Sequence, residues 1–195
     1  MKRRSIEKIR KLYLISSILV GILSPLTCLY LFPDFDPKKY PISYFGIFKD
    51  TSLIFLISLV IFSIAIFWNG ITIIRKLIKQ KKYHFILKAL LITASVCLFI
   101  TGIIPMDFKL LHQIPALFFF LIYNFFIFMF GITRSLSYVR KGLFSVLTGS
   151  VMLLSFLLVI PFPSYGVAEL VYIFLIFFWN ITMWIQCQKI NNYTN

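Results

Sequence analysis

Acidic residues, histidine and cysteine are scarce in this sequence. Six Asp and Glu residues stand against twenty Lys and Arg, and the 195 residues include only two His and three Cys. Cys28, Cys97 and Cys187 are odd in number and widely spaced, which excludes a disulfide framework and the ligand spacing of a zinc site. No phosphate-binding loop or other cofactor motif is present either. We therefore expect no metal centre and no cofactor.

Charged residues are also few beside the apolar ones. Charged residues make up 13% of the chain, hydrophobic residues 60% and aromatic residues 18%, and the mean hydropathy is +0.92. This composition excludes a water-soluble domain. A membrane-spanning helix needs about 20 apolar residues, and six segments meet that length, at residues 12–32, 51–74, 85–104, 112–132, 143–162 and 165–185. The sequence predicts an all-α polytopic membrane protein, with one six-helix transmembrane domain over residues 1–195.

Basic residues are unevenly distributed between the two sides of the membrane that six spans would create. Sixteen of the twenty fall on one side, and only Lys38, Lys39, Lys49 and Lys109 fall on the other. Because cytoplasmic loops carry an excess of Lys and Arg, both chain ends are predicted to lie in the cytoplasm. The net charge of +14 then reflects topology and attraction to anionic lipid headgroups, so we expect membrane lipids rather than nucleic acid as partners. The sequence gives no indication of oligomeric state.

The acidic residues gather on the opposite, outer side. Five of the six belong to it, namely Asp34, Asp36, Asp50, Asp107 and Glu169. Glu169 falls about one turn inside the sixth span, where a carboxylate is costly and should find an inward-facing partner. The candidates are His112 at the start of the fourth span, Lys109 and a backbone group. The simpler interpretation is that acids are tolerated outside the membrane and form no site.

Three functions are compatible with this outer polar set. The least demanding is a pocket that binds or organises lipid headgroups. A second is an intramembrane lipid hydrolase or transferase that uses Asp107, His112 and Glu169 as general acid and base, although no recognised catalytic motif is present. A small transporter ranks third, because the spans hold few ionisable residues. The catalytic residues, if any, are unknown from the sequence.

An aromatic residue followed by asparagine recurs in the second, fourth and sixth spans. The three pairs are Trp68-Asn69, Tyr123-Asn124 and Trp179-Asn180, at spacings of 55 and 56 residues. We favour coincidence in a chain rich in aromatic residues over a repeat. If the pattern is structural, it predicts amides that face inward and form hydrogen bonds across helices.

Three motifs together resemble the Frag/DRAM/Sfk family of six-helix membrane proteins. Residues 40–46 read Y-P-I-S-Y-F-G and resemble the family's P-Y-I-S-D-x-G segment. Residues 112–119 are similar to its H-x-x-x-A-x-x-F-F pattern, and residues 166–170 to its G-x-x-E motif. Tyr44 and Leu170 depart from the eukaryotic pattern, which has Asp and Trp there. The chain thus looks closest to the uncharacterised prokaryotic branch, of unknown function, which implies a prokaryotic plasma membrane.

The resemblance implies lipid-linked membrane biology and places Ser43, Gly46, His112 and Glu169 at the matched positions. With Tyr44 they form the set of candidate ligand-binding residues. Gly46 has an alternative explanation, a turn that requires positive φ. Prolines at 33, 37 and 41 indicate an ordered first outer loop folded over the mouth of the bundle. We expect residues 40–46 to pack against the outer ends of the fourth and sixth helices and to bring Ser43 near His112.

Overall fold

Helices account for nearly all of the chain in the structure, a computed structural model that describes residues 2–162 and 164–193, with side chains at 15–162 and 164–190. Over these residues the chain forms six α-helices and four short 3₁₀ helices, and no strand. The α-helices are α1 (Lys2–Leu31), α2 (Lys49–Leu77), α3 (His84–Ile103), α4 (Lys109–Ser135), α5 (Val139–Ser155) and α6 (Gly166–Tyr193). The 3₁₀ helices are η1 (Ile42–Gly46), η2 (Lys81–Tyr83), η3 (Met106–Phe108) and η4 (Phe156–Val159).

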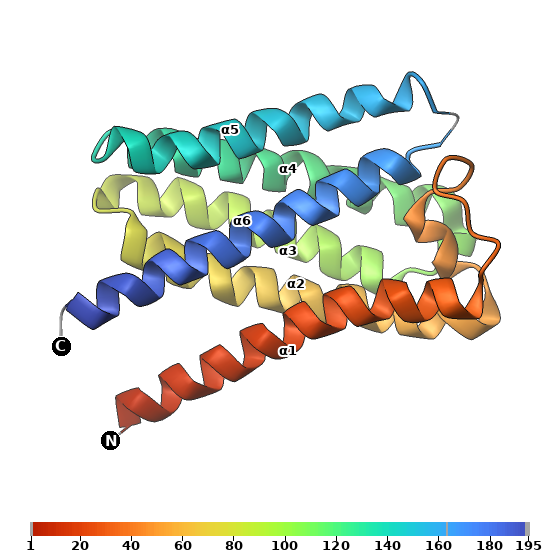
Figure 1. Ribbon diagram of the computed structural model, residues 1–195, viewed down its shortest axis with the longest axis horizontal. Coiled ribbons are helices and arrows are strands. Elements are labelled where there is room, and N and C mark those ends of the chain that lie inside the picture. Colours follow the sequence, from red (N-terminus) through yellow and green to blue (C-terminus); the bar gives the residue numbers. More distant parts are fainter. Residues whose placement is uncertain (1, 163, 194–195) are drawn as a thin grey trace.

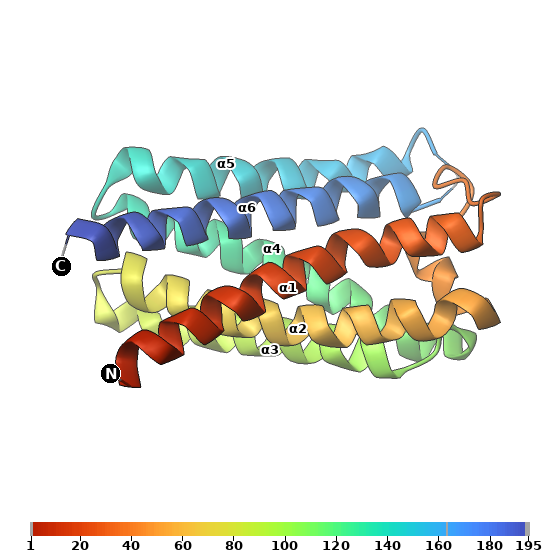
Figure 2. The ribbon, with the colours of Figure 1, turned by 60° about the horizontal axis from the view of Figure 1, so that its bottom comes forward.

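The helices run lengthwise through an elongated bundle, with both chain ends at the same end of the molecule (Figures 1 and 2). Within the described residues, five helical segments are long and apolar enough to cross a membrane, at Lys49–Leu77, Lys81–Ile103, Met106–Ser135, Val139–Val159 and Gly166–Ile190. Helix α1 carries a shorter apolar stretch, Ile15–Leu31. Long apolar helices of this kind make the chain an integral, multi-pass membrane protein.

The predicted spans agree with the helices in the middle and differ at the ends. Helix α1 begins about ten residues before the predicted start and α6 continues about eight residues past the predicted end, because both extensions are polar and were read as flanks. The fifth span differs in the type of helix at its end. Its α-helix ends at Ser155 instead of continuing to residue 162, and the tighter η4 follows. Pro161 follows soon after, and its ring nitrogen carries no N–H with which to continue the helix.

Consecutive helices are antiparallel neighbours, as the short connections predict. Contacts join each helix to the next along the chain, and α6 also packs on α2. Large aromatic side chains fill the core between α4 and α6, where Trp179 lies edge-on to Tyr123, Phe126 and Phe130. Helices α4 and α5 approach closely at two glycines: an added Cβ would lie 2.6 Å from the Val146 nitrogen at Gly131, and 2.4 Å from the Gly131 carbonyl oxygen at Gly142. Small residues permit such close packing between membrane helices.

The three asparagines after aromatic residues all face inward. The Asn69 amide donates to the Asn180 side-chain oxygen at 2.9 Å, and the Asn180 amide donates to the Tyr123 hydroxyl at 2.7 Å. Asn124 reaches α5, where its amide can donate to the Gly149 carbonyl and accept from the Leu153 amide, both at 3.1 Å. The hydrogen bonds therefore join α2, α4, α5 and α6 across the bundle. The structure thus shows the inward-facing amides, and the hydrogen bonds across helices, that a structural role for the pattern predicts.

The two ends of the bundle differ in charge. We call the end with both termini and the connections 78–83 and 136–138 the basic end. There the Lys79 ammonium donates to the Tyr138 hydroxyl, while Lys79 and Lys141 both lie over the Tyr138 ring, 4.6 and 4.7 Å from its centroid. The other end, with connections 32–48, 104–108 and 160–165, we call the acidic end.

The first connection at the acidic end folds into an ordered cap, residues 32–48, lying across the helix ends (Figure 1). Its η1 turn contacts α2, η3 and α6. The Thr51 hydroxyl fixes it by donating to the Phe45 carbonyl at 2.6 Å. Gly166 at the start of α6 lies against the cap, because a Cβ there would be 2.1 Å from the Tyr40 carbonyl oxygen. Only glycine permits that approach of two backbones.

Candidate functional site

Two cavities at the acidic end share one wall. The central cavity lies inside the bundle and has a volume of about 90 Å³. Apart from the shared wall, it is lined largely by apolar side chains of α1, α2, α3, α4 and α6. The lateral cavity, about 360 Å³, is lined mainly by α4 and α6 with Pro41 and Phe156. The residues common to both are Ser43, His112, Ala116, Phe120 and Glu169. Three predicted site residues, from the cap, α4 and α6, thus surround the same space.

Glu169 lies in the first turn of α6, as predicted. One of its carboxylate oxygens, Oε2, accepts a hydrogen bond from the Ile42 backbone amide at 2.6 Å. The Ser43 amide also interacts with the carboxylate, more weakly than the Ile42 amide. Successive amides at the start of a helical turn form a favourable anion site. Of the three partners considered from the sequence, the backbone group is therefore the one that the structure provides.

His112 lies one turn inside α4 and is buried, with 1% of its surface exposed. Its Nδ1 is 2.7 Å from the Ile104 carbonyl oxygen. Because a carbonyl only accepts, Nδ1 carries the proton in this contact, and the neutral ring then presents Nε2 as an acceptor. No hydrogen bond links His112 to Glu169 among the described residues. The two share a cavity wall, and His112, one of the three candidate partners, is not the group that forms a hydrogen bond with the carboxylate.

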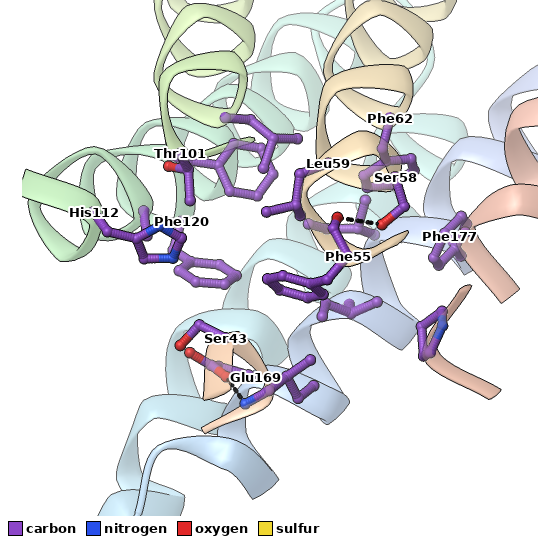
Figure 3. A pocket seen from close by; sticks show the side chains of 18 residues that line it. Ser43, Phe55, Ser58, Leu59, Phe62, Thr101, His112, Phe120, Glu169 and Phe177 are labelled. Carbon is purple, nitrogen blue, oxygen red and sulfur yellow. Dashed lines mark hydrogen bonds between the residues drawn. The ribbon is translucent and has the colours of Figure 1, made fainter. Parts of the chain in front are cut away.

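Ser43 completes the polar part of the wall. In Figure 3 its hydroxyl lies beside the Glu169 carboxylate, and the His112 ring lies on the other side of the cavity. The apolar remainder of the central cavity includes Phe55, Leu59 and Phe120. The result is a small polar patch at the outer end of an otherwise hydrophobic space, the arrangement usual for pockets that bind amphiphilic ligands.

The other predicted residues lie outside both cavities. Tyr44 is half-buried and stacks on Tyr40, with ring centroids 4.6 Å apart. Gly46 is buried against Met106 and Phe55, and no glycine among the described residues has positive φ, so the turn explanation for Gly46 is wrong. Its small size matters instead, because a Cβ would lie 3.4 Å from that of Met106. Asp107 is exposed on η3.

Several residues of the site were not singled out from the sequence. Ile42 and Ile104 contribute backbone groups, and no pattern of side chains identifies a backbone donor or acceptor in advance. Ala116 belongs to the motif at residues 112–119 but was not proposed as a site residue. Phe120 follows His112 at a spacing of eight, the spacing of one helix face, so it could have been found from His112. Among the described residues, no three His, Cys, Asp or Glu side chains come together as metal ligands.

The lateral cavity lies beside lipid-facing side chains. Ile114 and Leu117 line it and are about half exposed, which places them on the outer surface of α4. Tyr165, which directly precedes α6, and Tyr172 of α6 line the facing side. An opening between two membrane helices, close to the polar patch, could admit a hydrocarbon chain from the bilayer while the polar part of the same molecule reaches Glu169.

Residues 15–185 match the family described as Protein of unknown function (DUF998). No curated protein sequence and no solved structure matches the chain. The family match covers most of the chain, from within α1 to within α6, and includes every residue of the polar wall. The chain is therefore a member of the DUF998 family of proteins of unknown function.

Proposed function

We propose that this protein binds or organises membrane lipids, holding the headgroup at the polar wall of Ser43, His112 and Glu169. The observation that carries the proposal is that these three side chains, from the cap, α4 and α6, line the same two cavities. Each polar group adjoins apolar surface, so an amphiphile can form hydrogen bonds with the polar wall and pack its apolar part against the rest of the lining. A soluble polar ligand would leave the hydrophobic part of the cavities without a partner.

The chemistry of the wall favours a headgroup rich in hydrogen-bond donors. A carboxylate accepts only, the His112 Nε2 accepts in the neutral ring, and a serine hydroxyl can do both. Hydroxyl groups of a glycerol or sugar headgroup, or an ammonium group, are complementary to such acceptors. A bare phosphate is less suitable because it would approach the Glu169 carboxylate. The backbone amides of Ile42 and Ser43 already compensate that carboxylate.

The proposed topology has six spans in one domain over residues 1–195, with the basic end in the cytoplasm and the polar wall facing out. We add helix α1 to the five long apolar segments as the first span of the chain, because residues 12–31 supply about 20 largely apolar residues, or about 30 Å of helix. The charge asymmetry supports the orientation. By the same resemblance as before, we place the protein among the prokaryotic relatives of the Frag/DRAM/Sfk superfamily, in a plasma membrane.

Lipid binding is preferred to a lipid hydrolase or transferase because Asp107, one of three residues expected to share acid-base work, is exposed and lines neither cavity. Transport is not favoured by any described feature. The three ionisable or hydroxyl side chains of the wall lie at the acidic end, whereas coupled transporters bind substrate near the midplane.

Native mass spectrometry of the purified protein tests the proposal. Wild-type protein released from mild detergent should retain one lipid per chain. Replacing His112 by Phe fills the polar wall with an aromatic ring of similar size, and should reduce the retained lipid roughly tenfold, while Asp107→Asn should leave it unchanged. Equal retention in His112→Phe and wild type would refute a headgroup site at this wall.

A further inference from the structure

The basic end contains a buried cation that the outer pocket does not use. Arg134 lies in the last turn of α4, with 4% of its surface exposed. Arginine stays protonated in proteins, so this guanidinium is a permanent charge in a largely apolar setting. Such a residue inside a membrane protein ordinarily pairs with an anion or with strong acceptors.

The hydrogen bonds of Arg134 are inadequate for a buried guanidinium. One terminal nitrogen, Nη1, donates to the Met183 sulfur at 3.4 Å, and a thioether is a weak acceptor. Among the residues that the structure describes, the buried Nε has no hydrogen-bond partner. Within the described side chains the one ion pair is Lys39 with Asp36, at the opposite end, so no described carboxylate compensates Arg134.

We propose that Arg134 forms a second binding site, for a phosphate-bearing anion, at the basic end. The planar guanidinium suits phosphate oxygens, which it can engage with two parallel N–H donors, and the unpartnered Nε is one of those donors. The last turn of a membrane helix lies at the level of lipid phosphates, so an anionic lipid of the facing leaflet is one source and free phosphate is the other. The site is independent of the outer pocket.

Lipid titration of the full-length protein in detergent tests this site. Phosphatidylglycerol should raise the melting temperature of the wild type, whereas an uncharged glycosyl diacylglycerol should not. Arg134→Gln should weaken the retention of phosphatidylglycerol about tenfold, and Arg134→Lys should weaken it less because the charge remains. Arg140→Gln, at an exposed position two residues into α5, is the matched control and should behave as wild type.

Inorganic phosphate distinguishes the two sources. Stabilisation by millimolar phosphate, lost in Arg134→Gln, would assign the site to a soluble anion, whereas stabilisation by the lipid alone would assign it to the headgroup. Equal retention of the charged and uncharged lipids by the wild type, with no effect of phosphate, would overturn the proposal even if the Arg134 variants fail to fold. A second result would also overturn the proposal. If Glu7→Gln loses as much stability as Arg134→Gln in the absence of lipid, the anion that compensates Arg134 is a carboxylate of the chain itself.

Discussion

Glu169 should control whether the cap over the outer pocket stays closed. Its carboxylate accepts from the Ile42 amide at 2.6 Å, with the Ser43 amide beside it, and so links α6 to a loop more than 120 residues earlier in the sequence. Glu169→Leu removes both acceptor oxygens at similar volume. Glu169→Gln retains one acceptor oxygen but turns an NH₂ group toward the other amide.

The size of each effect follows from the donors left without a partner. A buried donor that loses its acceptor costs about 1–3 kcal/mol, and Ile42 is buried. Glu169→Leu orphans the Ile42 amide and also removes the weaker interaction with the Ser43 amide, so it should destabilise the closed cap by about 3 kcal/mol. Since 1.4 kcal/mol is a factor of ten, the population with a released cap should rise roughly a hundredfold. For Glu169→Gln we expect about 1 kcal/mol, or roughly fivefold.

Hydrogen exchange of residues 40–46, measured by mass spectrometry, reports this equilibrium directly. Exchange should become faster in the order wild type, Glu169→Gln, Glu169→Leu. Asp34→Asn is the matched control, because it removes a charge from an exposed position in the same cap and should not change the exchange rate. Identical protection of residues 40–46 in Glu169→Leu and wild type would refute the argument that this carboxylate holds the cap.

Three further predictions concern packing, the buried amides and topology. Gly166→Ala should lower stability by about 1–3 kcal/mol, measured as the melting temperature in detergent, because the new Cβ would meet the Tyr40 carbonyl. Asn180→Leu should cost about 1–2 kcal/mol in the same assay, because it removes cross-helix bonds worth about 1 kcal/mol each. A tag beside Lys81 should be inaccessible to an impermeant label in intact cells, and one beside Lys38 should react.

Controls separate these effects from general sensitivity to substitution. Gly46→Ala adds the same methyl group where the nearest atom is 3.4 Å away, and should cost well under the Gly166→Ala value. Thr182→Val removes a hydroxyl that bonds only within its own helix, and should change stability little. A melting temperature for Gly166→Ala equal to that of Gly46→Ala, or external labelling beside Lys81, would contradict the corresponding prediction.

The helices could be predicted from the sequence because each is a long, nearly uninterrupted apolar run. The predictions were wrong at the ends of individual helices. The change from α-helix to η4 after Ser155 depends on how the chain turns toward α6, and hydrophobicity alone does not report it. The polar extensions of α1 and α6 were not predicted, because an apolar run does not include the polar residues that continue a helix.

The site was predicted in composition but not in its contacts. The cost of burying charge identified Glu169 and His112, and the motifs added Ser43, so three of the wall residues were available from the sequence. Their partners were not, because the Ile42 amide and Ile104 carbonyl are backbone groups that every residue possesses. Arg134 was counted with the loop cations that set topology, since its burial depends on how α6 packs on α4.

Photocrosslinking with a lipid that carries a diazirine close to its headgroup is the most direct test of lipid binding at the outer pocket. With the protein in bilayers, mass spectrometry should find the crosslinks concentrated on the segments that form the polar wall, residues 41–43, 112–120 and 165–172, and should find them lost in His112→Phe. Crosslinks spread evenly over the lipid-facing surfaces of all helices, with the same pattern in His112→Phe, would contradict the account.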